Sequence, residues 1–131
     1  MPVYRLSEAA ALLGVSDDTL RRWADQGRVT PTTTPAGAAG IDGRELAALA
    51  ADRAHLEGAA TSPTTTSARN RLRGIVTDVT RDTVMAQVEL CCGPYRVVSL
   101  MSREAADALG LQPGVVADAV VKATTVVVET P

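Results

Sequence analysis

The sequence predicts an α+β chain of two small modules, a helical one followed by a β one. Residues 1–66 hold 14 of the 22 alanines but only three of the 16 valines, and alanine favours helices whereas valine favours strands. Between the two compositions lies a stretch of small and polar residues that is typical of a linker. We therefore expect a helical module over residues 1–56, a linker over 57–66 and a β module over 67–131. A chain of 131 residues has room for two such domains.

The first module is expected to open with a helix over 7–13, for which Ser7 is the predicted N-cap. A turn over 14–16 follows, and Ser16 is expected to cap a second helix that ends at Gln26-Gly27. On this helix Leu20 and Trp23 share one face, which favours a core role for Trp23. Helix, short turn with glycine and helix is the helix-turn-helix arrangement, whose second helix enters the major groove of DNA.

Residues 4–28 resemble the winged-helix heads of MerR-type regulators and excisionase-like proteins. The resemblance rests on the turn Leu-Gly-Val-Ser, on Thr-Leu-Arg at the start of the second helix, on Trp23 and on Gly27. It implies a wing hairpin over 29–41, a further helix over 43–54 and binding to double-stranded DNA. This wing has no basic residue between Arg28 and Arg44. The candidate DNA-binding residues are Ser16, Thr19, Arg21, Arg22 and Arg28.

Arginine can contact guanine or clamp a phosphate, which makes Arg21 and Arg22 the centre of this prediction. The alternative is that the two side chains form an ordinary solvated helix face.

The second module alternates apolar and polar residues over 72–76 and over 84–90, with Arg81-Asp82 as the turn between two strands. A third strand is expected over 95–101, followed by a short helix from the cap Ser102 to Leu109 that Gly110 ends in a left-handed conformation. A type II turn at 112–115 precedes closing strands over 115–122 and 125–129. Five short strands and one small helix predict a closed OB-like β-barrel.

This module resembles the Mop domain (molbindin, TOBE type) of molybdenum-pterin-binding proteins. The matching segments are Ser-Ala-Arg-Asn at 67–70, residues 102–111, and Lys-Ala-Thr-Thr-Val at 122–126. The resemblance implies a bound molybdate or tungstate oxyanion at interfaces between subunits, and no catalytic cofactor. Ala105 stands where the family often has a second hydroxyl. The candidate oxyanion-binding residues are Ser67, Ala68, Arg69, Asn70, Ser102, Lys122, Ala123 and Thr124.

The chemistry of these residues suits such an anion. Molybdate carries no proton at neutral pH, so a site made only of donors and positive charge favours it over hydrogen phosphate, whose proton needs an acceptor. Lys122 is the only lysine beside 12 arginines, which indicates a compact point charge. The alternative is chance in an arginine-rich composition.

Several function classes are disfavoured. The net charge of −2 gives no global attraction to nucleic acid, so any DNA contact must be local. No nucleophile–base pair, metal-ligand spacing or phosphate loop is present, and we expect neither an enzyme nor a metal held directly by protein ligands.

Cys91 and Cys92 are adjacent, and we expect them to be reduced and structural. No targeting signal or membrane-length apolar run is present, which predicts a cytoplasmic protein without a membrane partner.

The combined prediction is a transcriptional regulator in which the β module senses molybdate or tungstate and the helix-turn-helix binds DNA. The alternative is an intracellular store or buffer of molybdate, in which the N-terminal module serves assembly. A homo-oligomer is expected in either case. Single Mop domains form hexamers whereas MerR-type regulators bind DNA as dimers, so a hexamer is favoured and a dimer is the alternative.

Overall fold

The computed structural model describes residues 2–58 and 65–131, and the side chains of all of these except 55–58. The chain divides into two compact units, Met1–Pro63 and Thr64–Pro131. Residues 59–64 of the predicted linker lie outside the described residues. The first two linker residues belong to helix α3 (Gly43–Gly58), which is longer than the helix predicted over 43–54.

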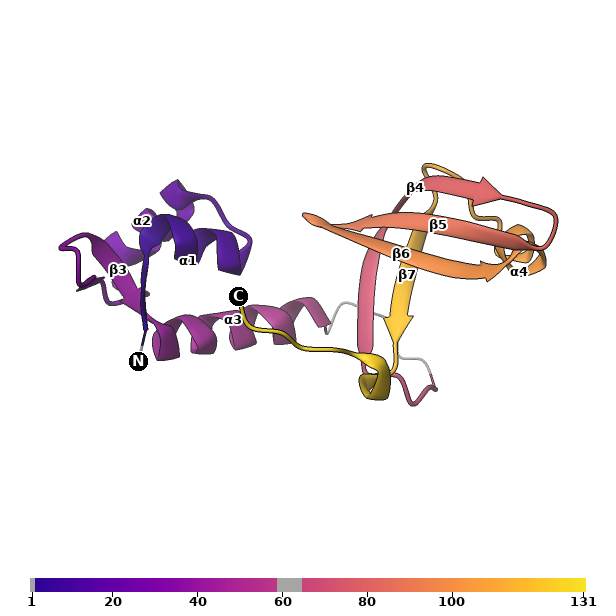
Figure 1. Ribbon diagram of the computed structural model, residues 1–131. Coiled ribbons are helices and arrows are strands. Elements are labelled where there is room, and N and C mark those ends of the chain that lie inside the picture. Colours follow the sequence, from indigo (N-terminus) through magenta and orange to yellow (C-terminus); the bar gives the residue numbers. More distant parts are fainter. Residues whose placement is uncertain (1, 59–64) are drawn as a thin grey trace. The chain divides into compact units, whose positions relative to one another are not determined.

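The N-terminal unit is a small winged helix-turn-helix (Figure 1). Strand β1 (Val3–Arg5) leads into helices α1 (Leu6–Leu13) and α2 (Asp17–Asp25), and strands β2 (Thr32–Thr33) and β3 (Ala39–Asp42) precede α3. The strands form an antiparallel sheet in the order β1-β3-β2. None of the described helices is long and apolar enough to cross a membrane.

The start of α1 differs from the prediction. The N-cap is Arg5 rather than Ser7, because the backbone N–H of Arg5 donates to the Glu8 carboxylate at 3.2 Å and the Arg5 guanidinium pairs with the same carboxylate at 3.0 Å. Strand β1 therefore passes directly into the helix. The predicted break after α1 is confirmed, since Gly14 adopts φ = 72°.

Helix α2 is fixed by its cap and by its apolar face. The Ser16 hydroxyl accepts from the backbone N–H of Thr19 at 3.1 Å, as predicted. Leu20 and Trp23 are buried and pack into the core of the unit, which confirms the core role of Trp23. The other buried members of this core are Ala9, Ala10, Leu13, Val29, Ile41 and Leu46.

The C-terminal unit is a strongly curled antiparallel sheet with one short helix. Its strands are β4 (Asn70–Arg81), β5 (Met85–Cys92), β6 (Tyr95–Ser102) and β7 (Val116–Val121), in the order β6-β5-β4-β7. Helix α4 (Arg103–Ala108) follows β6, and the 3₁₀ turn η1 (Ala123–Thr125) follows β7. Ser102 caps α4, Gly110 has φ = 66°, and Val115 N–H donates to Gln112 C=O at 3.1 Å, so three local predictions are confirmed.

Strand β4 produces the curl by pairing with two strands along its length. Asn70 to Ile75 pair with β7, whereas Ile75 to Arg81 pair with β5 (Figure 1). At the change of partner stands Gly74, where an added Cβ would lie 2.5 Å from the Cys91 carbonyl oxygen and 2.7 Å from Cys92 Sγ. Glycine is therefore required for the close approach of β4 and β5.

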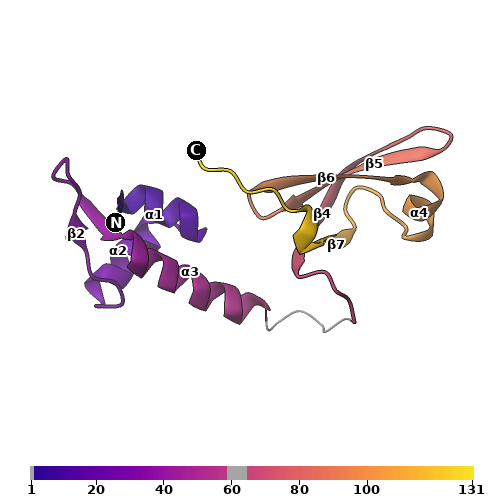
Figure 2. The same cartoon turned by 60° about the horizontal axis from the view of Figure 1, so that its bottom comes forward.

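The OB-like prediction is confirmed for the curl of the sheet but is wrong for its closure. The predicted last strand over 125–129 does not form: after η1 the chain has no regular structure, and the side chains of Val127 and Val128 are 83% and 84% exposed (Figure 2). The barrel is therefore open between β6 and β7. Val84, the first apolar residue of the alternation predicted over 84–90, lies in the β4–β5 turn and is 67% exposed, so strand β5 begins one residue later than predicted.

Gly74→Ala is expected to destabilise the C-terminal unit by about 2 kcal/mol, because a Cβ would force β4 and β5 apart. Urea unfolding followed by circular dichroism measures this loss. Gln87→Ala, on the exposed face of β5, serves as the control and should change stability by no more than about 0.5 kcal/mol. Equal stability of Gly74→Ala and the wild type would contradict the role given to the glycine.

Candidate functional site

The pairing of β4 with β7 brings most of the predicted oxyanion-binding residues together. Asn70 pairs with Val121 in the ladder, so the segment 67–70 lies beside the segment 122–124. The Asn70 amide donates from Nδ2 to the Val121 carbonyl at 3.1 Å, which uses one of its two N–H groups. The positions in question are Ser67, Ala68, Arg69 and Asn70 on one segment and Lys122, Ala123 and Thr124 on the other.

Lys122 is a cation of this cluster whose charge is not neutralised by a described carboxylate. Its side chain is exposed and forms no ion pair with any described residue. The turn that carries Lys122 is fixed locally, because the Thr125 hydroxyl donates to the Lys122 carbonyl at 2.9 Å. The Arg69 guanidinium instead donates to the Thr66 carbonyl at 3.1 Å and remains exposed. The two segments thus carry two cations, Lys122 and Arg69, and the hydroxyls of Ser67 and Thr124.

Ser102 is not brought to this cluster within one chain. It pairs with Met85 at the end of β6, near the Arg81 end of β4, whereas Asn70 begins β4. The 12 residues of β4 span about 36 Å of extended chain between these ends. Both ribbon views place α4 and η1 at opposite ends of the unit (Figures 1 and 2). The predicted site therefore consists of two separate half-sites per chain.

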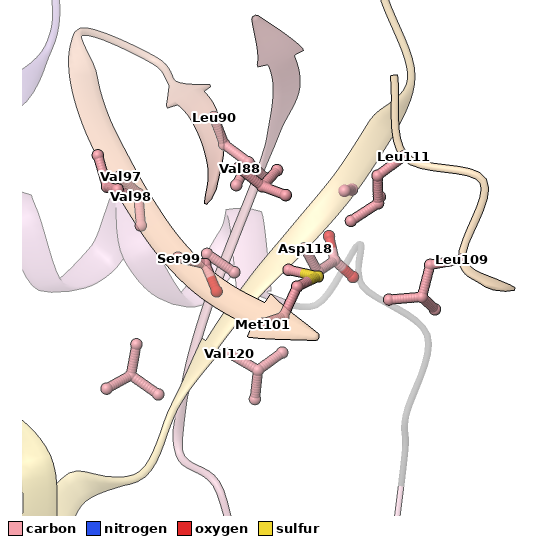
Figure 3. Close-up of a pocket in the computed structure, with 13 residues that line it drawn as sticks. Val88, Leu90, Val97, Val98, Ser99, Met101, Leu109, Leu111, Asp118 and Val120 are labelled. Carbon is pink, nitrogen blue, oxygen red and sulfur yellow. The ribbon is translucent and has the colours of Figure 1, made fainter. Parts of the chain in front are cut away.

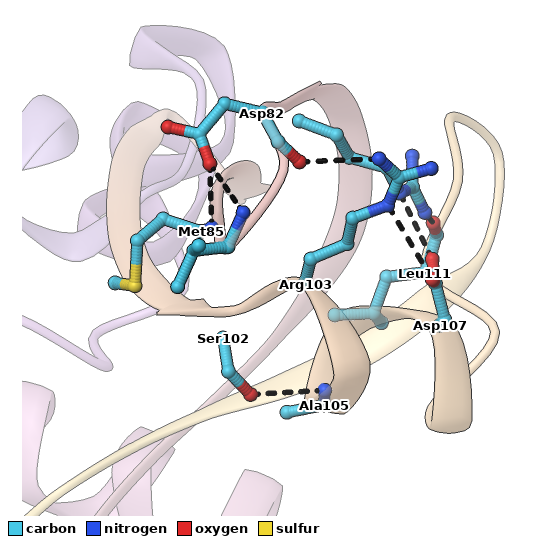
Figure 4. A network of polar contacts seen from close by, with 9 residues as sticks. Asp82, Met85, Ser102, Arg103, Ala105, Asp107 and Leu111 are labelled. Atoms are coloured by element: carbon cyan, nitrogen blue, oxygen red, sulfur yellow. Dashed lines mark hydrogen bonds and ion pairs between the residues drawn. The ribbon is translucent and has the colours of Figure 1, made fainter.

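The half-site at Ser102 is held by a network of ion pairs (Figure 4). Asp107 on α4 accepts from Arg81 Nε at 3.0 Å and lies 3.7 Å from Arg103 Nε, while Arg81 also donates to the Leu111 carbonyl at 2.8 Å. Arg103 donates to the Asp82 carbonyl at 3.2 Å. These contacts fix α4 against the end of β4.

The same network directs the Arg103 guanidinium towards Asp82 and Asp107, away from the Ser102 hydroxyl (Figure 4). Ser102 and Arg103 line an open hollow of about 520 Å³ together with Thr83, Val84, Glu104 and Asp107. Arg103 was not among the predicted site residues, although its position directly after the cap Ser102 is a signal that the sequence contains.

A third group of charges lies on the outer face of β4 and β7. Asp118 accepts from Arg73 Nε at 3.0 Å and from Arg71 at 3.3 Å. The Arg73 hydrogen bond, and then the charges of Arg73 and Arg71, hold the pKa of the Asp118 carboxyl below its usual value. Asp118 thus neutralises part of the arginine series at 69, 71 and 73 and ties β7 to β4.

In the N-terminal unit, the predicted DNA-binding residues fall into two groups. Ser16 and Thr19 are engaged in the helix cap, where their hydroxyls lie 2.8 Å apart. Arg21 and Arg22 are exposed on α2 and form no ion pair with any described residue. Arg28 stacks on the ring of Trp23, with its Cζ 4.5 Å from the ring centroid. The indole thus holds the Arg28 guanidinium at the end of α2.

The turn of the wing is closed by hydrogen bonds, and residues 29–41 carry no charged side chain. Its turn is closed by Thr34, whose hydroxyl accepts from Ala38 N–H at 3.0 Å and whose N–H donates to the Ala38 carbonyl at 2.8 Å. A side chain at Gly40 would meet the Tyr4 carbonyl oxygen at 2.6 Å. The basic side chains near this end of the unit are therefore those of α2 and Arg28, and residues 29–41 of the wing add none.

Both cysteines are free thiols on opposite faces of β5. Cys92 is buried and donates weakly to the Leu72 carbonyl at 3.7 Å, whereas Cys91 is half-buried. Burial raises the pKa of the Cys92 thiol, which keeps it protonated at neutral pH. Among the described residues, no group of three or more His, Cys, Asp or Glu side chains could hold a metal ion.

Two sequence profiles match the chain, one in each unit. The TOBE domain profile matches residues 66–128, and the MerR family regulatory protein profile matches residues 5–38. A search of curated proteins found no significant match.

Solved structures match the C-terminal unit. A molybdate binding protein from Sporomusa ovata is 30% identical, covering 51% of this chain and 100% of its own, with a TM-score of 0.49. MopII from Clostridium pasteurianum is 34% identical, covering 50% and 100%, with a TM-score of 0.47. The cytoplasmic molybdate-binding protein ModG is 39% identical, covering 46% of this chain and 43% of its own, with a TM-score of 0.44.

The two units, a helix-turn-helix and a curled half-barrel, define a modular protein in which each unit matches a different family. The chain belongs to the TOBE-domain proteins of the Mop kind and carries a MerR-type segment at its N-terminus. This membership rests on the profile matches and on sequence identity over the full length of two relatives.

Asp118→Asn is expected to lower the free energy of unfolding at pH 7, because the native ion pairs are lost. A carboxyl with a depressed native pKa stabilises the fold above its unfolded pKa and loses that effect as the pH falls through its native pKa. The difference from the wild type should therefore shrink towards zero at pH 3 and below. Urea unfolding at both pH values measures it, and an equal difference at both would contradict the ion-pair explanation.

Proposed function

We propose that this protein is a molybdate- or tungstate-responsive transcriptional regulator. The C-terminal unit binds the oxyanion, and the N-terminal unit binds double-stranded DNA. The observation that carries the proposal is the exposed, unpaired Lys122 beside Ser67, Asn70 and Thr124, aligned by the β4–β7 pairing. The relatives from Sporomusa ovata and ModG, both described as molybdate-binding, support the choice of ligand.

The Lys122 half-site suits a tetrahedral dianion without a proton. Its side chains offer hydroxyl, amide and ammonium donors. Lys122 and Arg69 supply charge-assisted hydrogen bonds, which are about twice as strong as neutral ones. A larger anion such as molybdate would reach more of these donors than sulfate does. No carboxylate among the predicted site residues competes for the donors.

The half-site at Ser102 supplies the remaining donors only if a second copy brings it close. The Ser102 oxygen already accepts from Ala105 N–H at 3.1 Å, so its hydroxyl hydrogen is available to an anion. We therefore propose that the complete site lies between copies in a homo-oligomer. The hexamer remains the favoured state and the dimer its alternative. ModG is described as cytoplasmic, which supports the same compartment for this chain.

DNA binding is proposed to use Arg21 and Arg22 for contact and Arg28 as a phosphate clamp. Stacking on Trp23 restricts the Arg28 side chain before binding, which lowers the entropy lost on contact. The anion would act by favouring one state of the oligomer over another, since a ligand shifts only states that it binds differently.

A molybdate store is the second candidate, and two observations favour it. Helix α2 carries Asp17, Asp18 and Asp25 beside its two exposed arginines, and the wing has no basic residue. Phosphate contacts supply most non-specific DNA affinity, so this charge balance weakens that contribution. In a store, the N-terminal unit would serve assembly only.

Titration calorimetry with molybdate tests the anion site, with sulfate and phosphate as competing anions. Micromolar or tighter binding is expected for molybdate, and a ligand at 100 times its dissociation constant should stabilise the fold by about 2.7 kcal/mol. Lys122→Met should weaken binding at least about tenfold, or about 1.4 kcal/mol. Arg96→Met, which removes a cation paired with Glu89, is the control. Equal affinity of molybdate and sulfate would exclude a dedicated oxyanion site.

Arg21→Ala combined with Arg22→Ala tests DNA binding. The double variant should lose affinity for operator DNA and reduce the slope of log K against log salt by about two, because two phosphate contacts are lost. Molybdate binding should not change. Arg44→Ala with Arg96→Ala removes the same charge elsewhere and serves as the control. DNA binding that survives the Arg21/Arg22 change would contradict the role given to these two arginines, and the absence of DNA binding in the wild type would favour the store.

A further inference from the structure

The two faces of the curled sheet carry different kinds of side chain. On the inner face, Val88 and Leu90 are among the side chains that line a largely apolar hollow of about 370 Å³ (Figure 3). Leu72 of β4 packs against the same core. Because successive residues of a strand point to opposite faces, Arg71 and Arg73 lie on the outer face of the sheet. The arginines of this part of β4 therefore face away from the core.

Charge is distributed unevenly over the C-terminal unit, although residues 67–131 hold seven basic and seven acidic side chains. The first half of β4 and the segments beside it carry four basic side chains and one acidic one: Arg69, Arg71, Arg73, Lys122 and Asp118. The second half of β4, its turn and α4 carry two basic side chains and four acidic ones: Arg81, Arg103, Asp78, Asp82, Glu104 and Asp107. A surplus of three positive charges thus lies at one end of the unit, and we call its four basic residues the β4 basic row.

The side chains of the β4 basic row are open to solvent. Arg69 and Lys122 are exposed, and the Arg73 side chain is 57% exposed. Arg73 donates to Asp118 from Nε at 3.0 Å and from one terminal nitrogen at 3.4 Å. A guanidinium carries five N–H groups, so the other three of Arg73 take no part in this pair. The row can therefore contact an anionic partner without first breaking the pair with Asp118.

The spacing of the row fits a regular polyanion. Alternate residues of an antiparallel strand lie about 6.8 Å apart, and each strand of a DNA duplex advances about 3.4 Å along the helix axis per phosphate. Arg71 and Arg73 are therefore spaced like every second phosphate of a DNA strand. A small dianion would engage only part of such a row, whereas a duplex can engage all of it.

We propose that the β4 basic row is a second DNA-binding surface, which contacts the phosphate backbone of the duplex held by α2. This inference rests on the proposed function and deepens it. The N-terminal unit has six arginines against eight acidic residues over 1–58, so it supplies few phosphate contacts for its charge. Both surfaces belong to one chain, so the second contact is intramolecular and adds affinity without a further partner.

The first test is a gain of binding. Asp118→Asn removes the only carboxylate of this end and releases Arg71 and Arg73, so a short labelled duplex of arbitrary sequence should bind about threefold more tightly at low salt. The slope of log K against log salt should become steeper by about one. Fluorescence anisotropy over a range of salt concentrations measures both quantities. The same variant is expected to be less stable, and lost stability alone would not tighten DNA binding.

Glu104→Gln is the matched control, because it removes the same negative charge at the α4 end of the unit. Its DNA affinity should equal that of the wild type. If Asp118→Asn binds the duplex no more tightly than Glu104→Gln, the inference is overturned.

The second test is a loss of binding. Arg71→Gln combined with Arg73→Gln should weaken binding of the same duplex at least about tenfold and lower the salt slope by about two. Arg71→Lys combined with Arg73→Lys keeps both charges and should retain most of the affinity. Circular dichroism checks that both double variants stay folded. Equal loss in the glutamine and lysine variants would overturn a role of the charges.

Combination with Arg21→Ala and Arg22→Ala separates this inference from the proposed function. Residual DNA binding that is lost only when Arg71→Gln and Arg73→Gln are added would support the β4 basic row even if α2 does not bind DNA. DNA binding that depends on Arg21 and Arg22 but not on the row would leave the proposed function standing and overturn the inference. A wild type that does not bind the duplex at low salt would overturn both.

Discussion

The C-terminal unit depends on a single long strand that changes partners. Because β4 pairs first with β7 and then with β5, its beginning aligns Asn70 with Val121 and its end anchors α4 through Arg81 and Asp107. Gly74 makes the change of partner possible by letting β5 approach without a side chain between the strands. The curl that results separates the two polar ends of the unit, and this separation decides how any ligand site must be built.

Local signals predicted much of the fold. The caps Ser16 and Ser102, the left-handed Gly14 and Gly110 and the turn at 112–115 each follow from interactions within a few residues. The predicted Ser7 cap did not form. The Glu8 carboxylate accepts from the backbone N–H of Arg5, and the helix therefore begins with Arg5 as its N-cap. The last strand failed for another reason: strand propensity at 126–128 is strong, but propensity alone does not pair a segment, and these residues join neither edge strand of the sheet, β6 or β7.

The candidate site was predictable only in part for a related reason. The ladder between β4 and β7 places the 67–70 and 122–124 segments together, although they are about 50 residues apart in sequence. The distance between them and Ser102 depends on the bend of β4, which periodicity does not encode. Arg103 follows Ser102 in sequence, but the direction of its guanidinium depends on the contact with the Asp82 carbonyl, 21 residues away in sequence. In the N-terminal unit, the stacking of Arg28 on Trp23 likewise depends on the tight turn after α2.

The position of Ser102 and Lys122 at opposite ends of one half-barrel has a consequence for the living cell. If the site is divided between copies as proposed, it exists only above the concentration at which chains associate, and its occupancy follows the amount of protein as well as the amount of anion. A newly made chain that has not yet associated with another would then not bind the anion. The response to the anion would begin only above a threshold concentration of the protein. Dilution of the protein by cell growth and division would end this response even at a constant concentration of the anion.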